Sequence, residues 1–220
     1  MHIFRWTHER DGPSLVPVVV CCDRRRGGEH GPRGRTCSNN RHHGKPTQSV
    51  FQHLAAEAPH TKDSACYRSE VVTLEDIPLY NEDLDQEPEI PSVVTFKKII
   101  AEREGVLIIT PEYNHGVPDV LKNALDWASR PVFESCFKNK PVSIISSSKA
   151  FTGGVRAQYQ LREALISMHA HLVMGPEVVV GGVHAALAED VYQDESGLSF
   201  MLRSLDGLRK DILSHSVACA

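Results

Sequence analysis

The chain has 220 residues, a net charge of −4, 41% hydrophobic residues and 24% charged residues. This length suits one well-buried domain and is short for two, so we expect a single domain over residues 1–220. The balanced charge argues against general nucleic-acid binding, and no apolar stretch approaches the roughly 18–20 residues of a membrane span. We therefore expect neither nucleic acid nor a membrane among its partners.

Six cysteines are spread along the chain without a CxxC pair or regular spacing. In a chain of this length, free thiols in a reducing compartment are the expected state. Charged residues such as Arg5 and Glu9 interrupt the N-terminus, which lacks the layout of a signal peptide, so we expect a cytoplasmic protein. His42 and His43 have no second ligand pair at usable spacing, so no metal site is expected.

Apolar runs alternate along the chain with segments of helical periodicity. In chain order, the pattern predicts a strand, then a helix, five times over: Leu15–Cys22, Ser49–Ala58, Glu70–Leu74, Pro91–Arg103, Val106–Thr110, Val117–Ala128, Pro141–Ser146, Val155–His169, an extended pair within Leu172–Val180, and Phe200–Leu213. Such alternation favours a parallel sheet with helices on both faces, because each right-handed crossover covers one face. We expect an α/β, flavodoxin-like three-layer sandwich whose five-stranded parallel sheet has the order 2-1-3-4-5.

Two segments fit this pattern poorly. Asp23–Lys45 carries seven Arg or Lys against two acidic residues and is too long for an ordinary strand-to-helix loop, so it is interpreted as an irregular basic insertion. Ala185–Leu198 is acidic and is interpreted as a surface excursion.

Residues 111–127 read Pro-Glu-Tyr-Asn-His-Gly-Val-Pro-Asp-Val-Leu-Lys-Asn-Ala-Leu-Asp-Trp and directly follow a buried strand. Pro111 makes the chain leave the sheet rigidly, and Glu112, Tyr113 and Asn114 then lie at the carboxyl end of that strand. Open α/β sheets bind ligands at this edge. Composition alone is equally compatible with a plain turn between strand and helix.

The same 17 residues resemble the P-E-Y-N…P…L-K-N-A-L-D-W signature of the NAD(P)H-dependent FMN reductases, a flavodoxin-like family of quinone, azo-dye and chromate reductases. The resemblance continues in order from Glu70 to Gly182. It implies that Pro111, Glu112, Tyr113 and Asn114 contact the isoalloxazine of FMN. It also implies that four later residues are structural or lie at a subunit interface: Lys122, Asn123, Asp126 and Trp127. Ser147 and Ser148 are placed near the flavin ring or ribityl chain, with helix capping as the alternative.

The phosphate-binding half departs from the family pattern. A Gly-Ser-x-Arg loop is expected directly after the first strand, but Cys22 is followed by Asp23-Arg-Arg-Arg. The later residues Ser38, Asn39, Arg41 and Ser49 are the candidates for holding the phosphate at a helix N-terminus. Asp23–Thr36 is then either a genuine insertion or sequence retained in error, and Arg41 is alternatively a solvated basic residue.

The resemblance implies an FMN-dependent NAD(P)H oxidoreductase that passes hydride through FMN to a quinone-like small acceptor by a ping-pong mechanism. No catalytic residue is assigned, because the cofactor performs the chemistry; His115 is either a proton relay or a surface residue. The family also implies a homodimer or homotetramer. Two alternatives stay open: a flavodoxin-like FMN-binding module without rapid NAD(P)H turnover, and a flavin-free fold with a degenerate phosphate loop.

Overall fold

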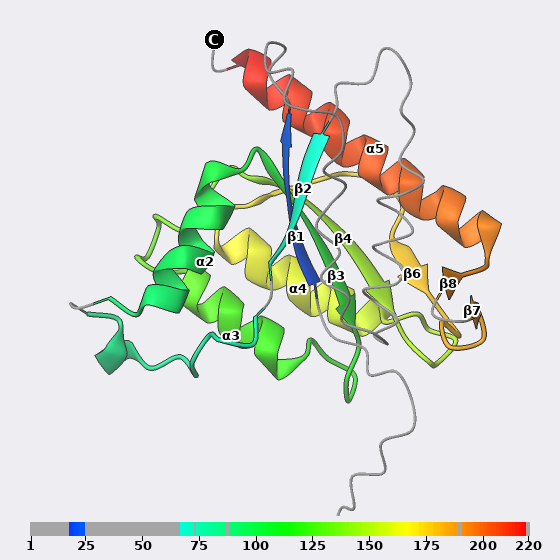
Figure 1. The fold of residues 1–220 in the computed structure, drawn as a ribbon, viewed down its shortest axis with the longest axis horizontal. Helices are drawn as coiled ribbons and strands as arrows, with labels where there is room; N and C mark the ends of the chain where they lie inside the picture. Colours follow the sequence, from blue (N-terminus) through cyan, green and yellow to red (C-terminus); the bar gives the residue numbers. More distant parts are fainter. Residues whose placement is uncertain (1–17, 25–66, 73, 87–88, 189–190, 219–220) are drawn as a thin grey trace, which may run out of the picture.

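The computed structural model describes residues 18–24, 67–72, 74–86, 89–188 and 191–218, and Figure 1 shows their arrangement. The strands are β1 (Val18–Arg24), β2 (Tyr67–Val72), β3 (Gly105–Pro111), β4 (Pro141–Ser147), β5 (His171–Leu172), β6 (Val178–Val180), β7 (Leu187–Ala188) and β8 (Val191–Tyr192). The helices are the short 3-10 helix η1 (Glu82–Leu84), α2 (Pro91–Glu102), α3 (Asp119–Ala128), α4 (Val155–Ser167) and α5 (Glu195–Ala218). From residue 67 to residue 180 the predicted elements are confirmed with shifted ends. The helix predicted at residues 49–58 lies outside the described residues.

The main sheet has the order β2-β1-β3-β4-β5, and β6 also pairs with β4. β5 and β6 are two pieces of one edge strand, since β5 pairs with the start of β4 and β6 with its end. The interruption contains Gly175 and Pro176 and divides the segment for which the sequence predicted an extended pair. Proline lacks the N–H that a ladder requires, so the strand separates from β4 at this point.

The prediction of a fully parallel sheet is wrong at β1. β1 pairs antiparallel with both β2 and β3, whereas β3, β4, β5 and β6 are parallel. A Val-rich apolar run has the same hydrophobic pattern in either direction, so the sequence of β1 does not set its polarity. As a result, the carboxyl end of β1 lies beside Gly105, at the edge of the sheet opposite Pro111.

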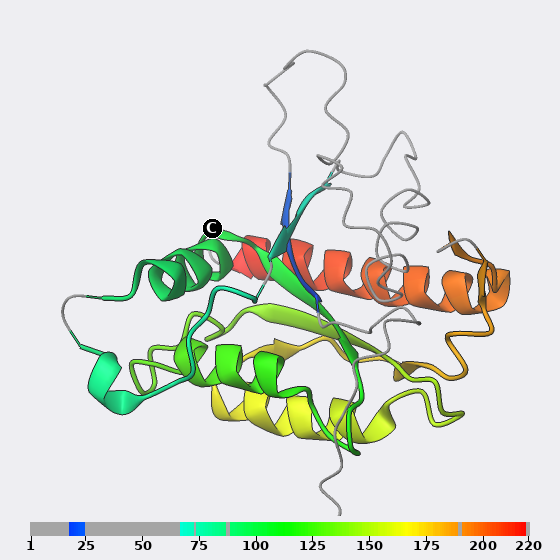
Figure 2. The ribbon, with the colours of Figure 1, turned by 60° about the horizontal axis from the view of Figure 1, so that its bottom comes forward.

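Helices cover both faces of the sheet. The first core joins α2, α3 and α4 to one face, with fully buried side chains such as Ile100, Leu121 and Leu161. The second core joins α5 to the other face through Met201, Leu208 and Ile212. Figure 2 shows α3 and α4 on one side of the sheet and α5 on the other. In the described residues, apolar side chains are therefore buried on both sides of β3 and β4.

The acidic segment Ala185–Leu198 is more structured than predicted. It contains the β7–β8 hairpin and the first turn of α5, and the Tyr192 side chain is buried. Burial, followed by the neighbouring Asp194 carboxylate, raises the pKa of Tyr192 to about 12. Asp194 caps α5 by accepting hydrogen bonds from the Ser196 and Gly197 N–H groups, both at 3.1 Å. Two-residue strands are too short for sequence periodicity to reveal.

The second half of the 111–127 signature holds α3 against an upstream segment. The Asn123 Oδ1 accepts a hydrogen bond from the Tyr80 N–H at 2.7 Å, and the Asn123 Nδ2 donates to the Pro78 carbonyl at 2.9 Å. The indole N–H of Trp127 donates to the same carbonyl at 2.8 Å. Lys122 instead forms an exposed ion pair with Asp126, one turn along the helix.

This contrast gives a stability prediction for two adjacent residues. We expect Asn123→Ala to lower the free energy of unfolding by about 1–3 kcal/mol, because it leaves partly buried backbone groups without partners. Lys122→Ala should cost less than about 0.5 kcal/mol, the typical value of an exposed i,i+4 pair. Chemical denaturation of both variants measures the difference, and equal losses would contradict the structural role of Asn123.

Candidate functional site

The carboxyl ends of β3 and β4 lie side by side and carry the two loops of the candidate site. Pro111 pairs with Ser147, and the Glu112 N–H donates to the Ser147 carbonyl at 3.3 Å. Beyond these strand ends run the β3–α3 loop, residues 112–118, and the β4–α4 loop, residues 148–154. Pro111, the first of the predicted ring contacts, is a buried strand residue.

A tight hairpin turn forms the tip of the β3–α3 loop. Tyr113 and Gly116 exchange backbone hydrogen bonds of 3.1 and 2.9 Å. Between them, Asn114 and His115 have φ values of 48° and 65°, so both occupy the left-handed region. This pair of positive φ angles defines a type I′ turn, in which Asn is favoured because it tolerates that conformation. The turn fixes the path of the backbone at the strand end, and all three side chains from Tyr113 to His115 are exposed.

The carboxylate of Glu112 points at helix α4 and not along the loop. Its Oε2 accepts hydrogen bonds from the N–H groups of Arg156 and Ala157, at 2.9 and 3.2 Å. The side chain is only 7% exposed, and its Oε1 lies 3.7 Å from the guanidinium of Arg156. Any contact that Glu112 makes with a bound ring therefore comes from its backbone.

A second side chain of α4 holds the far end of the same loop. The Gln160 Oε1 accepts a hydrogen bond from the Val117 N–H at 3.0 Å. The sequence analysis missed Gln160, because a glutamine inside a predicted helix carries no signal of a contact 43 residues away. Together with Glu112, it fastens the β3–α3 loop to α4 at both of its ends.

The two predicted serines differ in what their hydroxyl groups do. The Ser148 Oγ accepts a hydrogen bond from the Ala150 N–H at 3.1 Å, which closes its own turn. The Ser147 Oγ is buried and has no hydrogen-bond partner within the described part of the chain. A buried, unpartnered hydroxyl is costly unless a ligand or water satisfies it. Ser147 is therefore the better candidate for a ligand contact, and Ser148 for a structural role.

A buried polar network fixes the β4–α4 loop behind these serines. The Ser146 Oγ donates to the Gly153 carbonyl at 2.8 Å, and the Gln158 Nε2 donates to the Val178 carbonyl at 2.6 Å. Gly153 has a φ of 62°, and a Cβ there would lie 2.8 Å from the backbone of Val179. Glycine is required by both the conformation and the close approach. The loop is thus set between β4, β6 and α4.

The phosphate-binding candidates Ser38, Asn39, Arg41 and Ser49 all lie outside the described residues.

Among the residues that are described, no group of three His, Cys, Asp or Glu side chains could hold a metal ion. None of the helices of that part is long and apolar enough to span a membrane. Partial burial raises the pKa of the Tyr113 hydroxyl above its ordinary value.

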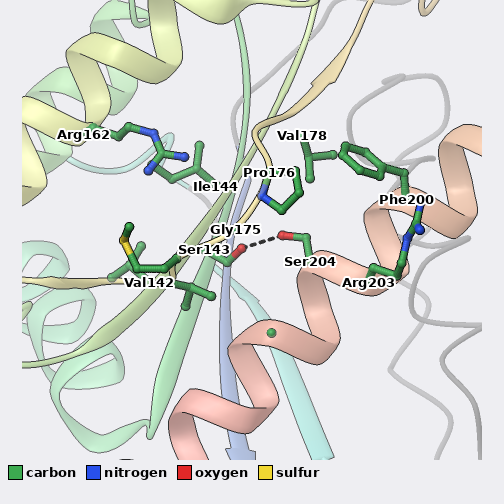
Figure 3. Close-up of a pocket in the computed structure, with 13 residues that line it drawn as sticks. Val142, Ser143, Ile144, Arg162, Gly175, Pro176, Val178, Phe200, Arg203 and Ser204 are labelled. Carbon is green, nitrogen blue, oxygen red and sulfur yellow. Dashed lines mark hydrogen bonds between the residues drawn. The ribbon is translucent and has the colours of Figure 1, made fainter.

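A cavity of about 190 Å³ lies away from these loops, at the interruption between β5 and β6. Figure 3 shows Arg162 and Arg203 on different sides of it, with the Ser143–Ser204 hydroxyl pair between them. None of its lining residues belongs to the β3–α3 or β4–α4 loop. We attribute it to the separation of the edge strand from β4, and we locate the functional site at the strand ends.

Comparisons with known proteins place this geometry in a family. The model of the NADPH-dependent FMN reductases matches residues 37–185, which include both strand-end loops and exclude β1. The chain belongs to this family. The match confirms the expected enzyme class, an oxidoreductase that uses FMN with NAD(P)H as electron donor.

Individual relatives agree with the assignment. An NAD(P)H-dependent FMN reductase of Pseudomonas aeruginosa is 37% identical over 141 residues, 64% of this chain and 76% of that protein. A quinone reductase of Escherichia coli is 44% identical over 112 residues, 50% of this chain and 58% of that protein. The solved structure of the flavoenzyme NAD(P)H:(acceptor) oxidoreductase FerB from Paracoccus denitrificans superposes with a TM-score of 0.62 and 30% identity, over 77% of this chain and 89% of that one. The shared fold is flavodoxin-like α/β.

The left-handed conformation of His115 gives a prediction for the turn. Non-glycine residues carry a cost of about 1 kcal/mol in this region, and a type I′ turn favours glycine after asparagine. We expect His115→Gly to raise the free energy of unfolding by about 0.5–1 kcal/mol, measured by thermal or chemical denaturation. Asn114→Gly serves as the control and should have a smaller effect. Destabilisation by His115→Gly would mean that the imidazole makes a stabilising contact.

Proposed function

We propose that this protein binds FMN at the β3 and β4 strand ends and transfers two electrons from NAD(P)H to a quinone-type acceptor. The observation that carries the proposal is the juxtaposition of a rigid backbone turn with the buried, unpartnered hydroxyl of Ser147, in a chain of the FMN reductase family. The described half of the site offers the ring a fixed turn and the buried Ser147 hydroxyl, and flavins are recognised mainly by preorganised polar groups along one ring edge.

The residues of the site have separate tasks. Backbone groups of Pro111–Asn114 would line one edge of the ring, with the type I′ turn holding them in place. The Ser147 hydroxyl would donate to a ring or ribityl oxygen, and Gly153 and Gly154 let the backbone approach closely. The exposed Tyr113 side chain would border the ring. The phosphate contacts are proposed for Ser38, Asn39, Arg41 and Ser49.

Bound FMN supplies hydride acceptance from NAD(P)H and two-electron donation to the acceptor. The overall reaction is NAD(P)H, a proton and a quinone giving NAD(P)⁺ and a hydroquinone. We propose that donor and acceptor use the same open side of the site in turn, which is a ping-pong mechanism. The proposed mechanism needs no buried acid–base pair in the chain, and the His115 side chain is exposed.

The acceptor and the assembly are inferred from relatives. Quinones are proposed because several relatives are named quinone reductases, although the matched segment spans only 58–64% of the length of those from Escherichia coli and Pseudomonas putida. We also propose a cytoplasmic homodimer or homotetramer, as the family resemblance implied. Size-exclusion chromatography with light scattering measures the assembly directly.

The test of the function is an absorbance spectrum followed by steady-state kinetics. We expect purified protein to carry or take up FMN at close to one per chain, and to oxidise NADPH or NADH in the presence of a benzoquinone. Protein that holds FMN without this turnover would be an FMN-binding module. Protein that stays colourless after FMN is added would be a flavin-free fold, and the proposal would be wrong.

Ser147 and Ser148 provide a matched pair for locating the cofactor. We expect Ser147→Ala to weaken FMN binding about three- to tenfold, the usual value of one hydrogen bond, as measured by quenching of flavin fluorescence. Ser148→Ala should leave the dissociation constant unchanged and lower stability slightly, because the Ser148 hydroxyl accepts a hydrogen bond from the Ala150 N–H and so closes its own turn. If Ser148→Ala weakened FMN binding more than Ser147→Ala did, the ring would lie on the Ser148 side of the strand end.

A further inference from the structure

The N-terminus of α4 is capped by a residue that lies more than 40 positions earlier in the chain. Its own N-cap residue, Gly154, has no side chain to accept the free N–H groups of the first turn. Gly154 also has a φ of 86°, and a Cβ there would lie 3.0 Å from the Cβ of Ser146. Close packing on β4 therefore excludes a local capping side chain. The Glu112 carboxylate takes that role across the site.

We propose that Glu112 is a positioning residue of the flavin site, and that its charge helps to set the balance between oxidised and reduced FMN. The inference rests on the proposed function, because it concerns the same strand-end loops. It assigns to Glu112 a task different from the ring contact that the sequence resemblance implied.

The positioning effect follows from adjacency in the chain. Glu112 lies between Pro111, which is fixed in β3, and Tyr113, which begins the type I′ turn. Its 7% exposed carboxylate accepts two charge-assisted hydrogen bonds from N–H groups of α4, which hold this residue to the helix. The side chain of Gln160 provides only one bond, at the other end of the loop. Without Glu112, the first residues beyond β3 lose their main restraint, and loop ordering must then accompany ligand binding.

The charge effect follows from the helix. The N-terminus of a helix carries a partial positive charge, equivalent to about half an elementary charge, which favours nearby anions. Glu112 occupies this end of α4 with a full negative charge, next to the loop expected to line the ring. Reduced FMN is more negative than oxidised FMN, so the carboxylate disfavours the reduced form relative to a neutral group at the same position.

The experiment compares two substitutions of Glu112 with one control. Glu112→Ala removes the tether and the charge, and Glu112→Gln keeps a hydrogen-bond acceptor without the charge. Asp194→Ala removes the equivalent cap of α5, on the opposite face of the sheet, and controls for loss of stability alone. The measurements are the dissociation constant of FMN, the visible circular dichroism of bound FMN, and the reduction potential of the bound cofactor.

We expect Glu112→Ala to weaken FMN binding about tenfold and to alter the visible dichroism. Glu112→Gln should restore binding and spectrum, while its affinity for reduced FMN relative to oxidised FMN rises about threefold, which appears as a higher potential. Asp194→Ala should lower thermal stability and leave all three flavin measurements unchanged.

Several outcomes would overturn the proposal. If Glu112→Ala binds FMN with the wild-type constant and spectrum, Glu112 is only a helix cap. If Glu112→Gln leaves the potential unchanged or lowers it, the charge effect is wrong. Should Glu112→Ala fail to fold, the reduction potential of FMN bound to Glu112→Gln decides whether the charge effect is correct. Wild-type protein that does not bind FMN would refute the proposed function instead, so the two failures are distinguishable.

Discussion

The parallel pairing of β3 with β4 is the constraint on which the site depends. Every residue of both strands is buried, and six residues of each are in register from Val106 and Val142 to Pro111 and Ser147. Because both strands run in the same direction and end at the same level, two loops far apart in sequence begin at adjacent positions. Helices on both faces keep this pair dry, so the strand ends cannot shift without disturbing two cores.

Helix α4 converts this adjacency into a defined geometry. It is joined to the β3–α3 loop by Glu112 and Gln160, and to β4 and β6 by the buried Gln158. All of these contacts involve the first half of the helix. The helix also packs in the core through Leu161 and Leu165. A binding site supported in this way is preorganised, which lowers the ordering cost of a ligand.

The sequence predicted those parts of the fold that local patterns encode. Helices α2 to α4 and strands β3 and β4 appear where periodicity placed them, because each buries a continuous apolar face. The sequence also predicted that residues 111–114 lie at the end of a buried strand, where β3 ends, and their contact with a flavin stays a prediction. The sequence did not predict the hydrogen-bond partners of Glu112 and Gln160. These contacts depend on how residues 43–45 positions apart in the chain meet in space. The type I′ turn was missed because His115 occupies a position where glycine is the usual signal.

The direction of β1 determines which end of the sheet its carboxyl end reaches. In the flavodoxin-like arrangement a strand in this position would aim its carboxyl end, and the loop after it, at the ligand. Here the register pairs Cys22 with Gly105 and Arg24 with Tyr67, so β1 ends and β2 begins at the opposite edge of the sheet. The carboxyl end of β1 is therefore not at the end of the sheet where β3 and β4 carry their loops. The family match likewise begins at Cys37, after this strand. The proposed ring contacts thus rest on the rigid ends of β3 and β4, whereas the residues proposed to hold the phosphate lie outside the described part of the chain.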